Sequence, residues 1–135
     1  MNEMDEMNEM SETLTPLTLE GLTVVPAVHE TKLRLTMSGA VEMRDPGEML
    51  NPFWSRMDLE ARTRNLQAVE LDLRDLNFMN SSGILTLVRW ITKLKINPGY
   101  RLVFRYDRNV TWQRSSIPTL AKLAPNVVVP LEING

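Results

Sequence analysis

Segments with the period of a β-strand alternate along this chain with segments that have the period of an α-helix. Polar and apolar residues alternate at 32–37, 66–73 and 101–106, as they do in strands with one buried face. Between these segments, residues 45–64 and 82–94 carry apolar side chains at helical spacing. Such alternation favours a largely parallel sheet joined by right-handed crossovers, and no other feature of the sequence constrains the fold as strongly.

Two further strands complete the expected order β-β-α-β-α-β-α-β. A first edge strand is predicted at 22–25, where Pro26 limits it, and a last short strand at 126–130. The alternating strands keep one polar face, and we expect Glu70 and Asp72 to lie on that solvated face. The sequence therefore predicts an α/β domain with a mostly parallel sheet of 4–5 strands and helices mainly on one face.

The ends of two predicted helices are open to alternatives. The first helix begins either at Asp45 or at Pro52, with Asn51 as its cap in the second case. A later helix is capped by Asn109, and Pro118 marks either a break or the start of a second short helix.

The length of 135 residues corresponds to one domain. In residues 1–12 methionine recurs every third position between Asn, Asp and Glu, a period that fits neither helix nor strand. We therefore predict a disordered acidic tail over 1–14 and a single folded domain over 15–135. All fifteen Lys and Arg residues follow position 30, but this mild positive bias is too small to indicate nucleic-acid binding.

The composition excludes several kinds of site. There is no cysteine and one histidine, His29, so disulfides, thiolate metal sites and the common zinc sites cannot form. No secretory signal is present, and no apolar stretch approaches the roughly 20 residues of a membrane span. The motif Gly-x-Ser-x-Gly is absent. We expect a cytoplasmic protein that is not an enzyme and needs no cofactor, with neither a nucleic acid nor a membrane as partner.

Two adjacent serines begin the strongest predicted helix. Asn80 or Ser81 would serve as its N-cap, and Ser82 and Gly83 follow. Helix N-termini carry unpaired N–H groups and a partial positive charge, so an anion is stabilised there, including a phosphate on a serine. From these residues alone, the turn is either a plain helix cap or a switch site.

The run LDLRDLNFMNSSGILTLVRW, from Leu71 to Trp90, resembles the signature of the STAS domains of bacterial anti-sigma-factor antagonists. In that family a strand ends in Asp-Leu-x-x-Leu/Val-x-Phe-Met-Asp-Ser-Ser-Gly-Leu, and the helix that follows carries the switch. The resemblance is close over 66–90 and looser over 17–130. It implies phosphorylation of the serine after the acidic position, which is Ser81 here, with Ser82 as the alternative.

The resemblance also implies a set of partners. The unphosphorylated protein would bind a serine kinase of the histidine-kinase-like ATPase type that doubles as an anti-sigma factor, and a PP2C-type phosphatase would reverse the modification. A homodimer is left open. The partner interface is expected at the turn and the start of the helix, over Met79, Asn80, Ser81, Ser82, Gly83, Ile84 and Leu85.

Asn80 departs from the family pattern, which has Asp at this position. Asn keeps the hydrogen bonding of Asp but carries no charge, which would define a subgroup with Asn-Ser-Ser-Gly. Two alternatives to the phosphorylated switch therefore stay open. One is a STAS-like scaffold that is not phosphorylated, and the other is a sensor of a small ligand or nucleotide at the helix N-terminus.

Overall fold

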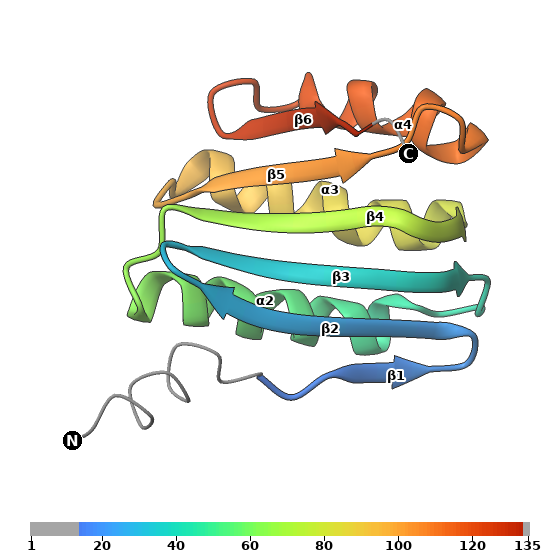
Figure 1. The fold of residues 1–135 in the computed structure, drawn as a ribbon, viewed down its shortest axis with the longest axis horizontal. Helices are drawn as coiled ribbons and strands as arrows, with labels where there is room; N and C mark the ends of the chain where they lie inside the picture. Colours follow the sequence, from blue (N-terminus) through green and yellow to red (C-terminus); the bar gives the residue numbers. More distant parts are fainter. Residues whose placement is uncertain (1–13, 134–135) are drawn as a thin grey trace.

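The computed structural model describes residues 14–133, which form a six-stranded sheet and three helices (Figure 1). The predicted acidic tail, apart from Leu14, lies outside the described residues. The elements in chain order are β1 Leu17–Leu19, β2 Leu22–His29, β3 Lys32–Val41, α2 Gly47–Thr63, β4 Ala68–Met79, α3 Ser81–Ile96, β5 Arg101–Tyr106, α4 Thr111–Ala121 and β6 Val128–Glu132.

The strands lie in the sheet in the order in which they occur in the chain. β1 with β2 and β2 with β3 are antiparallel, whereas β3 to β6 are parallel. The expectation of a mostly parallel sheet of 4–5 strands was therefore wrong, because the N-terminal strands form an antiparallel meander. Pro26 lies inside β2 opposite Leu35 rather than ending the strand. β1 pairs with β2 only as far as Val24, so the missing N–H of Pro26 falls on a free edge.

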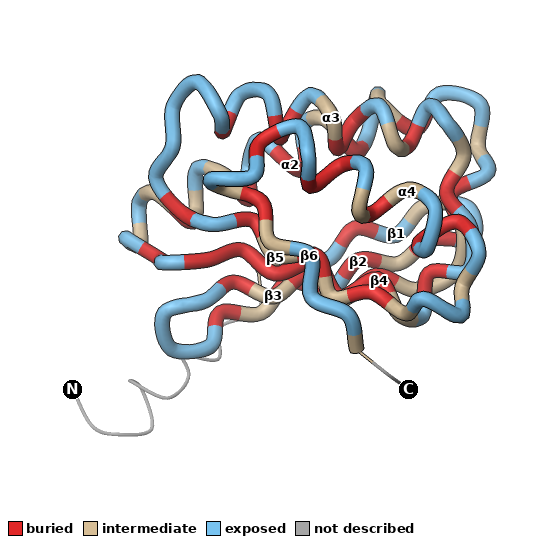
Figure 2. Tube along the Cα trace, turned by 90° about the horizontal axis from the view of Figure 1, so that it is seen from above, coloured by how far each residue is buried: buried red, intermediate tan, exposed pale blue. Residues whose placement is uncertain are grey.

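All three helices cover the same face of the sheet (Figure 2). This arrangement agrees with the one-sided cover expected from the strands. The core lies between the two layers, where alternate residues of each strand point toward the helices. Its central, fully buried members include Leu33, Leu35, Met37, Leu71, Leu73 and Phe104.

β4 is longer than predicted and runs without a turn as far as Met79. Its pairing with β5 ends at Asp72, but its pairing with β3 continues to the end of the strand. The carbonyl groups of Leu73 and Leu76 accept hydrogen bonds from side chains of α4 instead of from β5. Extended backbone therefore carries the chain directly to Asn80 and the start of α3.

Two helices contain a proline that the sequence placed at a boundary. Pro52 lies within α2, whose N-cap residue is Pro46, and Pro118 lies within α4. The residue at the N-cap of α4 is Val110, not the predicted Asn109. Pro52 is exposed, so water can satisfy the carbonyl that its missing N–H leaves free. Among residues 14–133, no helix is both long enough and apolar enough to cross a membrane.

Candidate functional site

Asn80 holds together three segments at the start of α3. Its side-chain oxygen accepts a hydrogen bond from the backbone N–H of Gly83 at 2.8 Å, so Asn80 is the N-cap. Its side-chain NH₂ donates to the carbonyl oxygen of Met43 at 2.9 Å, and its backbone N–H donates to Val41 at 3.0 Å. The amide thereby fastens the segment after β3 to the junction of β4 and α3.

Gly83 is required by packing rather than by an unusual backbone conformation. A Cβ at this position would lie 2.8 Å from Cγ of Met79, 3.0 Å from Cγ1 of Val41 and 3.3 Å from the side-chain oxygen of Asn80. Real Cβ atoms essentially never lie within 3.0 Å of another heavy atom, so a side chain at this position would force Met79 to shift. The missing side chain lets the first turn of α3 sit directly on the ends of β3 and β4.

Ser81 and Ser82 occupy the first two positions of α3, and both are exposed. Neither hydroxyl makes a hydrogen bond with another residue of the described part of the chain. The first turn of α3 has no acidic residue, so the partial positive charge of the helix start is not neutralised there. An enzyme can therefore reach these hydroxyls, and a phosphate attached to either would be favoured by the helix dipole.

Exposed apolar residues occur on both sides of the two serines along the chain. Leu85 is 47% exposed and Phe78 is 44% exposed, and the second of these was not among the residues expected from the sequence. Ile84 is half-buried against the core. Met79 and Gly83 are buried, so these two residues shape the turn from beneath, while Ser81, Ser82 and Leu85 form its outer surface.

A hollow of about 460 Å³ opens beside one of the two serines. Ser82 lines it, together with Arg44 from the segment after β3 and Arg89 from α3. The remaining lining residues are Asp45, Pro46, Gly47, Glu48, Asn51, Leu85 and Thr86. Ser81 is not part of the lining, so a phosphate on Ser82 would meet cationic side chains that a phosphate on Ser81 would not.

Glu70 and Asp72 are not the solvated carboxylates that strand alternation suggested. They are 4% and 6% exposed on the helix-free face of the sheet, where arginine side chains cover them. Glu70 accepts hydrogen bonds of 2.8 and 3.1 Å from Arg34, and Asp72 accepts bonds of 2.8 and 2.9 Å from Arg74. Sequence alternation identifies the face of the sheet, but it does not reveal how neighbouring side chains cover that face.

These ion pairs set the charge state of the two carboxyl groups. Burial by itself would raise the pKa of Glu70, but hydrogen bonds and positive charge from Arg34, with Lys32 and Arg105 nearby, hold that pKa below its usual value. Burial would likewise raise the pKa of Asp72, but hydrogen bonds and positive charge from Arg74 outweigh burial and hold that pKa below its usual value. Both groups remain ionised at neutral pH, so the pair serves structure better than acid–base chemistry.

Two side chains of α4 support the strand that leads to the site. Gln113 is fully buried and donates to the carbonyl groups of Leu73 and Leu76, while its own oxygen accepts from the N–H of Asp107 at 2.8 Å. Trp112 donates its indole N–H to Leu76 at 2.7 Å. Sequence reasoning missed this role, because no local pattern shows that β4 continues beyond the end of its pairing with β5.

Within residues 14–133, no group of three or more His, Cys, Asp or Glu side chains is placed to hold a metal ion. No protein-family model matches the sequence, and a search of the curated proteins finds no match.

Comparison with solved structures finds one of similar fold. A solved anti-sigma factor antagonist from Mycobacterium paratuberculosis matches this chain with a TM-score of 0.61, over 83% of this chain and 88% of that one. The two proteins share a fold. Their sequences are 17% identical, so the likeness concerns the fold alone. It agrees with the STAS-like α/β domain that the motif around Ser81 implied.

Proposed function

We propose that this protein is a regulatory protein–protein interaction module of the anti-sigma-factor-antagonist type, switched by phosphorylation of Ser81, with Ser82 as the alternative acceptor. It would act in the cytoplasm and without enzymatic activity of its own. Its expected partners are a serine kinase of the histidine-kinase-like ATPase type that also serves as the anti-sigma factor, and a PP2C-type phosphatase.

One observation carries this proposal. Two exposed serine hydroxyls without hydrogen-bond partners in the described residues begin α3, with exposed Leu85 one turn further along the helix. A protein with the fold of an anti-sigma factor antagonist thus presents modifiable hydroxyls and apolar contact area side by side. That combination suits a surface that binds a partner in one state of modification and releases it in the other.

The switch would work through local electrostatics. A phosphate adds about −1.5 to −2 charges at pH 7. If the start of α3 lies in an interface, this charge must be desolvated without a cation from the partner, which costs several kcal/mol and weakens binding by about a hundredfold or more. Leu85 and Phe78 would supply apolar contact to the unmodified complex.

The experiment is a quantitative pull-down from the native cells with three baits: Ser81→Ala, Ser81→Asp and Ser115→Asp. Ser115 is exposed on α4, so its substitution controls for the added charge alone. We expect the Ser81→Ala and Ser115→Asp baits to capture the ATPase-type kinase, and the Ser81→Asp bait to fail to capture it. Mass spectrometry of the native protein, in growth and under stress, should find phosphate on Ser81 or Ser82 in an amount that changes with condition.

Unmodified serines in both conditions, together with equal capture by all three baits, would contradict the switch. The same result would favour a STAS-like scaffold that binds through this turn without phosphorylation. One observation favours that second candidate. The side chain of Asn80 donates a hydrogen bond to Met43 at 2.9 Å, which an ionised Asp cannot do, so the turn is built around a neutral amide.

A further inference from the structure

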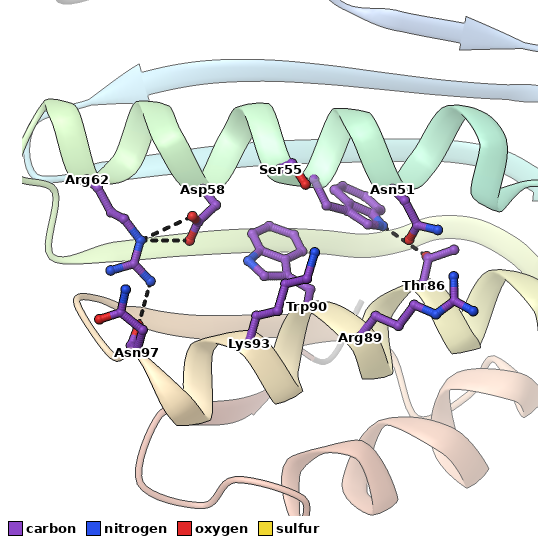
Figure 3. Close-up of a pocket in the computed structure, with 10 residues that line it drawn as sticks. Asn51, Ser55, Asp58, Arg62, Thr86, Arg89, Trp90, Lys93 and Asn97 are labelled. Carbon is purple, nitrogen blue, oxygen red and sulfur yellow. Dashed lines mark hydrogen bonds and ion pairs between the residues drawn. The ribbon is translucent and has the colours of Figure 1, made fainter.

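A second hollow lies on the helical layer, between α2 and α3. It adjoins the hollow beside Ser82, with which it shares Asn51, Thr86 and Arg89. Its volume is about 290 Å³, near the lower limit for small-ligand sites. Figure 3 shows side chains from both helices converging on it, with Asp58 and Arg62 at one end and Asn51 and Thr86 at the other.

Two stacked indole rings form the floor of this groove. Trp54 of α2 and Trp90 of α3 have ring centroids 5.1 Å apart and an interplanar angle of 22°. Both indole N–H groups are used inside the protein, since Trp54 donates to Thr86 at 2.9 Å and Trp90 donates to Tyr100 at 2.7 Å. The floor is therefore rigid and apolar, and it offers no hydrogen-bond donor to a ligand.

The wall that α3 contributes is cationic. Arg89 and Lys93 lie one helical turn apart and both line the groove (Figure 3). α3 contains no acidic residue, and neither side chain forms an ion pair with any residue in 14–133. Like charges at this spacing destabilise a helix slightly, so an anion between them would remove a repulsion as well as gain two charge-assisted contacts.

The acidic residue of the groove does not neutralise these cations. Asp58 accepts two hydrogen bonds of 3.1 Å from Arg62 and one of 2.6 Å from the hydroxyl of Tyr100. The carboxylate oxygens of Asp58 therefore accept hydrogen bonds at one end of the groove. At the same end, Arg62 also donates to the carbonyl of Asn97. Apart from the paired Asp58 and Arg62, the polar groups that α2 contributes to the groove are the neutral side chains of Asn51 and Ser55.

We propose that the α2–α3 groove binds a small organic anion, with its carboxylate or phosphate between Arg89 and Lys93 and its apolar or planar body against the tryptophan floor. The neutral polar groups of Asn51 and Ser55 would orient the body of the ligand. A free anion of this kind fits the hollow better than a protein segment does, because the groove closes at Arg62 and Asn97. Neither Ser81 nor Ser82 lines this groove, and the proposal requires no phosphate on them, although Arg89 also lines the hollow beside Ser82.

The test is an NMR titration of the ¹⁵N-labelled full chain that follows the indole N–H signals. Two matched pairs of probes separate charge from shape: indole-3-acetate against indole-3-acetamide for a carboxylate, and AMP against adenosine for a phosphate. With at least one of the two anions we expect saturable shifts of the Trp54 and Trp90 signals. The Trp112 signal should stay in place, since that indole donates to Leu76 beneath α4.

Variants then assign the anion contact. Arg89→Gln and Lys93→Gln should each weaken binding by about tenfold, the loss of one charge-assisted contact. Lys95→Gln is the matched control, because Lys95 is an exposed base of α3 that does not line the groove. The proposal is overturned if neither anion gives a saturable shift below about 10 mM, if the neutral analogues bind equally well, or if the two variants bind like Lys95→Gln.

Discussion

The side-chain amide of Asn80 donates a hydrogen bond of 2.9 Å to the carbonyl of Met43, while its oxygen accepts one of 2.8 Å from the N–H of Gly83. These two bonds connect the segment after β3 to the start of α3. A donor and an acceptor are both needed on one short side chain, which Asn provides and an ionised Asp does not. The departure of this position from the Asp of the STAS pattern thus has a local structural consequence.

The first prediction separates the two bonds. Asn80→Ala removes both and should lower the free energy of unfolding by about 2 kcal/mol. Asn80→Asp keeps the cap but loses the donor, so it should lose only about 1 kcal/mol. Urea denaturation measures both values, and Asn77→Ala, at an exposed position of β4, is the control. In about 1 M salt, where the favourable charge of Asp at the helix start is screened, full stability of Asn80→Asp would show that the bond to Met43 contributes nothing.

The second prediction concerns the tight packing at Gly83. Alanine favours a helix over glycine by up to about 1 kcal/mol, yet the added Cβ would lie 2.8 Å from Cγ of buried Met79. Overpacking should win, and Gly83→Ala should be less stable by roughly 1 to 2 kcal/mol. In a double-mutant cycle, Met79→Ala opens the space, so the combined loss should be smaller than the sum of the single losses. Additive losses would mean that the clash does not govern this position.

The order of the elements from β2 onward and the capped start of α3 followed from local patterns, because hydrophobic period and capping residues act over a few neighbouring positions. The three-residue edge strand β1 was not predicted. Asn80 was one of two caps that the sequence allowed, and the structure selects it. The bond from Asn80 to Met43 spans 37 positions, and no local pattern signals it.

The errors share the same cause. Glu70 is buried because Arg34, 36 positions earlier, lies over it on the neighbouring strand. β4 extends to Met79 because β3 and the α4 side chain of Gln113 supply its partners from outside the local sequence. Sequence alternation reports which face a residue takes, but burial on an open sheet face depends on which long side chains meet there.

The third prediction is a dependence of stability on pH. The pKa values of Glu70 and Asp72 are lower in the folded protein than usual, so their contribution is complete above the unfolded-state values of about 4 and is lost as pH falls through the folded-state values. Unfolding free energies measured between pH 7 and about pH 2 should therefore fall most steeply below about pH 4. Glu70→Gln removes one titrating group and should make this acid limb shallower, whereas Asp75→Asn, at an exposed site of β4, should change it little.

The fourth prediction tests the support that α4 gives to the end of β4. Gln113→Ala removes the partner of the Leu73 carbonyl and of the N–H of Asp107 from a fully buried side-chain site, while the carbonyl of Leu76 keeps its bond from Trp112. The loss of stability should be about 3 kcal/mol or more. Amide hydrogen exchange should rise most in the second half of β4. Arg114→Ala, at the adjacent exposed position, should leave both quantities near those of the unmodified protein.

The last prediction separates the effect of charge on the fold from its effect on a partner. Ser81 is the first residue of α3, where the helix dipole favours negative charge and no acidic residue is present in the first turn. Ser81→Asp should therefore raise the stability of the isolated protein by about 0.3 to 1 kcal/mol, and Ser81→Asn, of the same size but neutral, should not. The gain should shrink in about 1 M salt, where the Debye length is about 3 Å. If Ser81→Asp instead destabilised the isolated protein, its failure to bind a partner could be a folding defect, and only a phosphorylated protein of normal stability would then serve to test the switch.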